Sequence, residues 1–87
     1  MSTERTMESI RIPMAEIYVP AKRRSTLKAD KVDALAESII ENGLKLPISV
    51  RKGNGRYVLI EGLHRLEACR ALGEDTIDCI IVRARQH

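Results

Sequence analysis

The chain has 87 residues, a length that fits one small domain. A core of this size is marginal without a ligand or a partner subunit, so a homodimer is one expectation. Fifteen Lys and Arg residues against 12 Asp and Glu give a net charge of +3, which permits contact with nucleic acid but does not require it. Phe and Trp are absent and Tyr occurs twice, which argues against binding of single strands by stacking of bases on aromatic side chains.

The two cysteines, Cys69 and Cys79, fall in a predicted helix and a predicted apolar strand. This placement is typical of buried thiols in a reducing compartment and argues against a structural disulfide. The first eight residues are polar, and no run approaches the roughly twenty apolar residues of a membrane span. We therefore expect a cytoplasmic protein without a membrane segment.

The first elements are expected to follow a flexible N-terminus over residues 1–9. Apolar residues alternate over 10–12 until Pro13, which predicts a short strand. A second extended segment is predicted over 17–19. Residues 20–28 are rich in Lys and Arg and are expected to form a basic loop.

A helix is the most strongly predicted element of the chain. Ala29-Asp30 offers an N-cap, and Asn42-Gly43 provides the stop signal. The apolar residues between them recur at helical spacing and are expected to face the core: Val32, Leu35, Ala36, Ile39 and Ile40.

The second half of the chain begins with two predicted strands, over 47–51 and 57–60. The glycines and Asn between them allow the positive φ angles of a hairpin turn. A helix running to about Leu72 follows, and then a strongly apolar strand over 77–82.

These elements predict an α+β fold with a mixed sheet of about four strands and two main helices. We expect one domain over 10–83 and a C-terminal tail over 84–87, because no repeat or low-complexity tract divides the chain.

The segment Glu61-Gly62-Leu63-His64-Arg65 stands where a predicted strand gives way to a helix. The first turn of a helix has unsatisfied N–H groups and roughly half a positive charge, so cations there cost about 0.3–1 kcal/mol unless an anion is present. A strand, a glycine and donors at a helix N-terminus form the general layout of a phosphate site. The segment therefore predicts binding of a phosphate.

The order of a helix, Gly43, Pro47-Ile48, a Gly/Asn hairpin and then Gly62-Leu63-His64-Arg65 with Ala68 resembles the ParB/sulfiredoxin superfamily. The resemblance covers roughly residues 10–82. It implies that Gly62, Leu63, His64 and Arg65 bind the phosphates of a nucleotide.

The resemblance also extends to residues earlier in the chain. The segment 19–24 is similar to the family's first motif, which implies that Arg24 or Arg23 faces the nucleotide. Lys31 and Ser38 stand at positions similar to those of a Lys and a hydroxyl residue in sulfiredoxin, and their separation of seven puts them on one helix face.

The two branches of the superfamily imply different activities. Leu63 stands where sulfiredoxin has its catalytic Cys, and a leucine has no nucleophile, so sulfinic acid reductase activity is not expected. ParB continues into a helix-turn-helix and a dimerisation segment for which this sequence shows no counterpart. For this chain the resemblance therefore implies the nucleotide-binding module alone. This would be a ParB-like nuclease or N-terminal domain that binds a nucleoside triphosphate, ATP or CTP with Mg²⁺.

Slow hydrolysis of the nucleotide or metal-dependent cleavage of DNA is a further implication of the resemblance. The candidate catalytic residues are Glu61, His64 and Arg65, with positioning and electrostatic stabilisation of a phosphoryl centre as the mechanism. The sequence predicts no metal site made by protein ligands alone, but Glu61 could hold a Mg²⁺ that is bound mainly by phosphates.

Alternatives remain open from the residues themselves. Arg65 could pair with Glu61 or Glu67 and need no ligand, and His64 could be an ordinary surface residue. A non-enzymatic DNA-binding accessory protein of a partition or plasmid-type system would use its loop and hairpin cations on phosphates: Arg11, Lys22, Arg23, Arg24, Lys52 and Arg56. Protein interaction through an exposed edge strand is a third class.

Overall fold

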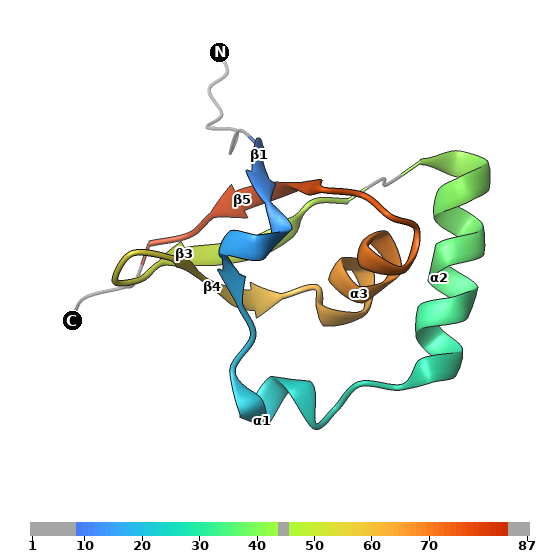
Figure 1. Ribbon diagram of the computed structural model, residues 1–87, viewed down its shortest axis with the longest axis horizontal. Helices are drawn as coiled ribbons and strands as arrows, with labels where there is room; N and C mark the ends of the chain where they lie inside the picture. The colour runs from blue at the N-terminus through green and yellow to red at the C-terminus, as the bar shows by residue number, and fades with distance from the viewer. Residues whose placement is uncertain (1–8, 44–45, 84–87) are drawn as a thin grey trace, which may run out of the picture.

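The computed structural model describes residues 9–43 and 46–83, so the expectations for a flexible N-terminus and for a tail over 84–87 fall outside it, apart from Ser9. Figure 1 shows one curved sheet with its helices. In chain order the elements are β1 (Ile10–Pro13), the 3₁₀ turn η1 (Met14–Glu16), β2 (Ile17–Tyr18), α1 (Ala21–Arg24), α2 (Ala29–Asn42), β3 (Ile48–Lys52), β4 (Tyr57–Glu61), α3 (Leu63–Ala71) and β5 (Thr76–Ile81).

The sheet is mixed, as predicted, and has the strand order β1-β5-β3-β4-β2. The β3–β4 hairpin is antiparallel, β5 pairs in parallel with β3, and the edge strands β1 and β2 pair with β5 and β4. The described part of the chain forms five strands rather than about four. The shortest of them is β2, whose two residues pair with β4 and lie within the segment predicted as extended over 17–19.

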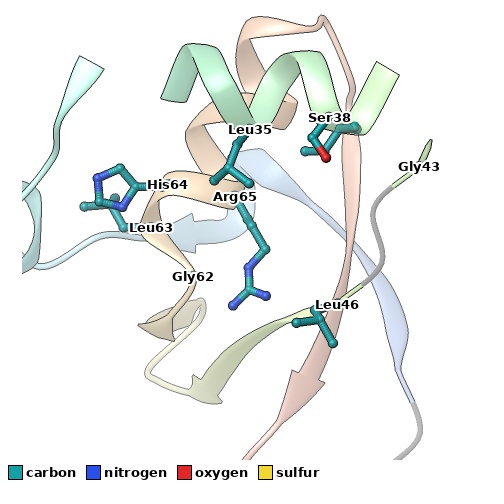
Figure 2. Close-up of a pocket in the computed structure, with 9 residues that line it drawn as sticks. Leu35, Ser38, Gly43, Leu46, Gly62, Leu63, His64 and Arg65 are labelled. Carbon is teal, nitrogen blue, oxygen red and sulfur yellow. The ribbon is translucent and has the colours of Figure 1, made fainter. Parts of the chain in front are cut away.

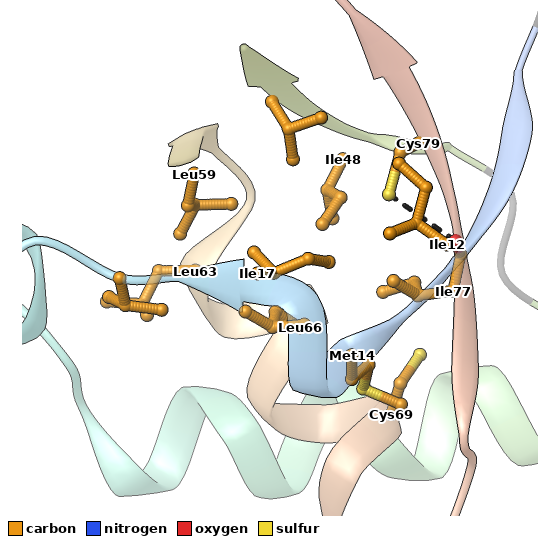
Figure 3. Packing of buried hydrophobic residues seen from close by; sticks show 12 residues of the cluster. Ile12, Met14, Ile17, Ile48, Leu59, Leu63, Leu66, Cys69, Ile77 and Cys79 are labelled. Carbon is orange, nitrogen blue, oxygen red and sulfur yellow. Dashed lines mark hydrogen bonds between the residues drawn. The ribbon is translucent and has the colours of Figure 1, made fainter. Parts of the chain in front are cut away.

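The core lies between one face of this sheet and α3 (Figure 3). The sheet contributes Ile48, Val50 and Leu59 to this core, and α3 contributes Leu66. All four side chains are almost fully buried. Alternate residues along each strand point toward this layer. The side chains between them therefore point to the opposite face of the sheet.

The helix α2 packs against α3 rather than against the sheet (Figure 1). None of its residues is fully buried, because a helix that touches a single neighbouring helix buries only a narrow stripe. Val32, Leu35, Ala36 and Ile39 are half-buried as predicted, but Ile40 is 68% exposed, so its predicted inward placement is wrong.

The segment predicted as a basic loop contains the short helix α1. Pro20 has the fixed φ of a helix start, and its carbonyl accepts from the N–H groups of both Arg23 and Arg24. The start of α2 also differs from the prediction. Lys28 rather than Ala29-Asp30 is the N-cap. Asp30 lies in the first turn, where its negative charge is attracted to the positive end of the helix dipole.

Candidate functional site

Gly62 joins β4 to α3 in a conformation that other residues rarely adopt. Its φ is 107° and its ψ is 29°, in the left-handed region. A Cβ at this position would lie 2.6 Å from the Cγ2 atom and 3.2 Å from the Cα atom of Ile48. The glycine therefore allows the start of α3 to lie directly against β3.

This junction leaves backbone donors at the start of α3. The N–H of Leu66 donates to the carbonyl of Gly62 over 2.9 Å, which closes the first turn of the helix. The N–H groups of Leu63, His64 and Arg65 precede that bond and have no partner within the helix. No side chain caps this end of the helix within the described residues. The end of α3 therefore presents the donors and the positive pole to which an anion binds.

A cavity of about 470 Å³ opens between the first turn of α3 and one side of α2. Figure 2 shows α2, with Leu35 and Ser38, on one side of the cavity and the start of α3, with Gly62 and Arg65, on the other. Apolar side chains dominate the wall from α2, and the polar groups gather at the α3 end. The lining residues are Leu35, Ser38, Ile39, Gly43, Leu46, Gly62, Leu63, His64 and Arg65.

The side chain of Arg65 extends into this cavity (Figure 2). Glu67, one of its two conceivable ion-pair partners, lies 3.6 Å from Arg70 instead. Within the described ranges, neither Glu67 nor Glu61 forms an ion pair with Arg65. Arg65 is half-buried and stands in the first turn of α3, so its positive charge and the positive end of the helix attract an anion together.

His64 has a structural contact that the sequence did not indicate. Its Nε2 atom accepts a hydrogen bond from the backbone N–H of Lys28 over 3.1 Å. An accepting Nε2 carries no proton, so the neutral ring has its proton on Nδ1, and Nδ1 is the atom that can donate to a ligand. The side chain thus connects the N-terminus of α2 to the first turn of α3.

Ser38 is the other predicted phosphate residue that the structure brings to the cavity. Lys31 lies two turns earlier on α2, is exposed, and is not among the lining residues. The Nη2 atom of Arg24 donates to the carbonyl of Val19 over 3.1 Å, which holds α1 to the end of β2 rather than to the cavity. Glu61 ends β4, is exposed, and does not line the cavity.

Several lining residues were not predicted as part of a site. Leu35 and Ile39 were assigned to the core by their helical spacing, but they cover the cavity as well. Gly43 at the end of α2 and Leu46 before β3 also line the cavity. Gly43 was singled out in the sequence as a helix stop signal and not as part of a site.

The cysteines lie in the core and away from the cavity lining. Burial raises the pKa of Cys69, and the carboxylates of Glu74 and Asp78 raise it further. Burial, with a smaller contribution from Asp78, raises the pKa of Cys79 to about 11. Both side chains are therefore protonated thiols at neutral pH, and the Cys79 thiol donates to the carbonyl of Ile77 over 3.4 Å.

The predicted DNA-contact residues are spread over several places. Lys22 and Arg23 line a hollow together with Arg51, which the sequence did not single out, and Lys52 lines a neighbouring hollow. The guanidinium of Arg56 stacks 3.9 Å from the ring centre of Tyr18. Arg11, by contrast, forms an ion pair with Asp78 over 3.3 Å.

Residues 9–43 and 46–83 contain neither a helix that could span a membrane nor a cluster of metal-ligating side chains. None of the helices there is long and apolar enough to cross a membrane. Their His, Cys, Asp and Glu side chains form no group of three or more that could hold a metal ion.

The chain matches the model of the ParB N-terminal domain over residues 1–87. It is 38% identical over 72 residues to the chloroplastic/mitochondrial sulfiredoxin of Arabidopsis thaliana, a match that covers 83% of this chain and 58% of the relative. It is 40% identical over 67 residues to a probable chromosome-partitioning protein ParB of Helicobacter pylori, covering 77% of this chain but 23% of that protein.

Solved structures agree with these matches. The crystal structure of the Arabidopsis sulfiredoxin superposes with a TM-score of 0.77 at 36% identity, covering 87% of this chain and 85% of that one. A C-terminally truncated ParB from Caulobacter crescentus, complexed with CTP-gamma-S, gives a TM-score of 0.74 at 26% identity and covers 88% of this chain and 45% of that one. The predicted α+β fold is thereby confirmed, and the chain belongs to the ParB N-terminal domain family.

Proposed function

We propose that this domain binds a nucleoside triphosphate, ATP or CTP, in the cavity between α2 and α3. The observation that carries the proposal is the convergence of the Arg65 guanidinium and the free first-turn N–H groups of α3 on one cavity. The Caulobacter ParB that shares this fold is in complex with a CTP analogue, which supports a nucleotide as the ligand. The cavity volume of about 470 Å³ lies within the range that holds small ligands.

In this proposal the phosphates lie at the α3 end of the cavity. The N–H groups of Leu63, His64 and Arg65 donate to phosphate oxygens, and the Arg65 side chain adds charge-assisted hydrogen bonds. Ser38 on the facing helix supplies a hydroxyl donor, and His64 donates from Nδ1 while its Nε2 remains bonded to Lys28. Arg24 and Lys31 would join only if the segment from α1 to α2 moves toward the ligand.

The base would lie toward the apolar wall formed by Leu35, Ile39 and Leu46. Such side chains contribute burial of a ring but offer no hydrogen-bond donor or acceptor. We therefore expect discrimination between ATP and CTP to be weak in this domain.

Calorimetric titration of ATP and CTP, each with and without Mg²⁺, tests the proposal. The wild type is compared with Arg65→Ala and with Arg70→Ala. Arg70→Ala is a matched control because it removes the same charge from the same helix. The Arg70 side chain pairs with Glu67 and does not line the cavity. Loss of the Arg65 contacts should weaken binding about 10- to 100-fold, since hydrogen bonds to charged groups contribute about 1.5–3 kcal/mol.

The outcomes of this titration separate the alternatives. Binding that is weakened in Arg65→Ala and retained in Arg70→Ala supports the cavity as the phosphate site. Equal weakening in both variants would indicate a general effect of net charge. Absence of heat with every nucleotide, for a wild type whose folding is verified, would overturn the nucleotide proposal.

Hydrolysis of the nucleotide or cleavage of DNA is a finer proposal for the same site. Glu61 is exposed beside Gly62 and could bind a Mg²⁺ that is held mainly by the phosphates, while His64 and Arg65 stabilise charge on the phosphoryl group. Phosphate release and nicking of plasmid DNA, each measured with Mg²⁺ or Mn²⁺, test these activities. An activity that belongs to this site must fall in Glu61→Gln or Arg65→Ala, whereas an unchanged rate would point to a contaminant.

Sulfinic acid reduction is not part of the proposal. The Leu63 side chain belongs to the core, and both cysteine thiols are buried with raised pKa values, so no described thiol is placed to act as a nucleophile in the cavity.

A further inference from the structure

The start of α2 is tied to α3 by a polar contact. The backbone N–H of Lys28, the N-cap residue of α2, donates to the Nε2 atom of His64 over 3.1 Å. The two residues are 36 positions apart in the sequence, so the bond is a tertiary contact. Within residues 9–43 and 46–83, no other side-chain hydrogen bond or ion pair connects the two helices.

The remaining contact between the two helices leaves α2 partly exposed. Val32 and Leu35, in the first two turns of α2, are half-buried, and no residue of the helix is fully buried. The side chain of Lys28 does not cap the helix that it begins. The bond to His64 therefore contributes directly to fixing where the start of α2 lies.

This bond requires a neutral imidazole ring. Nε2 accepts through its lone pair, so the single proton of the ring is on Nδ1. A second proton would occupy Nε2 and make both ring nitrogens donors. The N–H of Lys28 would then face another N–H, and the bond could not form. Histidine is the side chain that ordinarily gains this proton between about pH 5 and 8.

Protonation would also place a cation between the ends of two helices. His64 lies in the first turn of α3, and its bonding partner Lys28 is at the N-terminus of α2. Each of these helix ends has a partial positive charge of about half a unit. Repulsion from both ends therefore adds to the loss of the hydrogen bond once the ring is charged.

The other charged groups near the contact do not duplicate this behaviour. Glu67 pairs with Arg70, and Arg65 is the charged residue that lines the cavity together with His64. Carboxyl groups ordinarily ionise near pH 4, and Lys and Arg lose their protons above about pH 10, so a transition between about pH 5.5 and 8 belongs to a histidine or to the amino terminus. The charged residues within three positions of either partner are Lys28, Asp30, Lys31, Glu61, Arg65 and Glu67.

We propose that His64 is a pH-sensitive latch between α2 and α3. The neutral ring holds the start of α2, and protonation of the ring releases it. The latched state binds one proton fewer at this ring than the released state, so the latch weakens as the pH falls. Leu35 lies two turns into α2 and lines the cavity together with His64 (Figure 2), so release changes the wall of the cavity.

NMR spectroscopy of the isotope-labelled chain between about pH 5.5 and 8, without nucleotide, tests the latch. The backbone amide signal of Lys28 should shift with the same midpoint as the ring signals of His64. At the upper end of this range, long-range proton–nitrogen spectra should show the proton of the ring on Nδ1. Hydrogen exchange of the Lys28 amide, corrected for the intrinsic rate at each pH, should be about 2- to 10-fold faster at the acid end, the factor that a typical hydrogen bond contributes.

The two histidines of the chain provide a variant and its matched control, His64→Gln and His87→Gln. A Gln amide oxygen can accept from the Lys28 N–H but does not gain a proton in this range. The Lys28 signal should therefore lose its transition in His64→Gln. It should keep the transition in His87→Gln, which removes the other imidazole.

Three results would overturn the proposal. A Lys28 amide that does not shift at the midpoint of His64 would show that the ring does not hold it. The same transition in His64→Gln would assign the shift to another group. A proton on Nε2 at the upper end of the range would exclude the ring as an acceptor, and this result needs only the wild type, so it decides the matter even if a variant fails to fold. All three are independent of nucleotide binding, because no nucleotide is present.

Discussion

Gly62 is the single residue on which the position of α3 depends most directly. Gly62→Ala should destabilise the domain by about 2–4 kcal/mol, the sum of a left-handed conformation and a clash in a packed region. The clash is with Ile48, whose Cγ2 atom would lie 2.6 Å from the new Cβ. Urea denaturation of the variant and the wild type measures the change in the free energy of unfolding.

Gly73→Ala is the matched control for this substitution. Gly73 also has a positive φ, 83°, but an added Cβ there would meet nothing within 4 Å. Gly73→Ala should lower the free energy of unfolding only by the cost of a left-handed backbone conformation, about 1–2 kcal/mol. Equal losses in the two variants would show that the close approach of Gly62 to Ile48 does not contribute.

At the scale of elements, the position of α2 relative to α3 sets the shape of the cavity. No residue of α2 is fully buried and no side chain of its own caps its N-terminus, so the helix is held by half-buried contacts with α3 and by the bond from Lys28 to His64. His64→Ala should remove that bond at a cost of about 0.5–1.5 kcal/mol. Amide hydrogen exchange at Lys28 and in the first turn of α2 should become faster.

The exchange experiment distinguishes anchoring from a direct ligand contact. His64→Gln, whose amide oxygen is an acceptor, should restore part of the protection of the Lys28 amide. If nucleotide affinity falls in His64→Ala while exchange in α2 is unchanged, His64 acts on the ligand and not through α2. Unchanged exchange alone would contradict the anchoring role.

At the scale of the whole molecule, the buried thiols link stability to alkaline pH. The pKa of Cys79 is raised to about 11 in the folded domain from an ordinary value of 9.0. Above pH 9 the unfolded chain releases this proton first, so the unfolded state is favoured as the pH rises. Stability should therefore be unaffected below pH 9 and should fall by about 2 kcal/mol by pH 11.

Denaturation of the wild type and of Cys79→Ala at a series of pH values from 8 to 11 checks this prediction. The variant removes a buried side chain and will be less stable overall, so the comparison concerns the slope against pH and not the absolute value. The slope above pH 9 should be shallower in Cys79→Ala. Parallel curves would assign the alkaline loss to other groups.

Much of the fold follows from local signals in the sequence. The period of apolar residues predicted α2, and the turn residues between β3 and β4 predicted the hairpin. The strand-to-helix junction at Gly62 was likewise predicted at the place where β4 ends and α3 begins, because strand, glycine and helix are consecutive in the chain. Local patterns missed the helix α1, because an element of four residues is too short to establish a period.

The sequence by itself determined the α+β class, the glycine turn into α3 and the cations of its first turn, because each depends on neighbouring residues. Only the tertiary structure decided which distant residues share a surface. It placed Ser38 in the cavity and Lys31 outside it, used Arg24 to hold Val19, and gave His64 a bond to Lys28. It also brought Arg51 together with Lys22 and Arg23 in one hollow. Such neighbours depend on helix docking and strand register, which are fixed by burial of the whole core and leave no mark in any short segment of sequence.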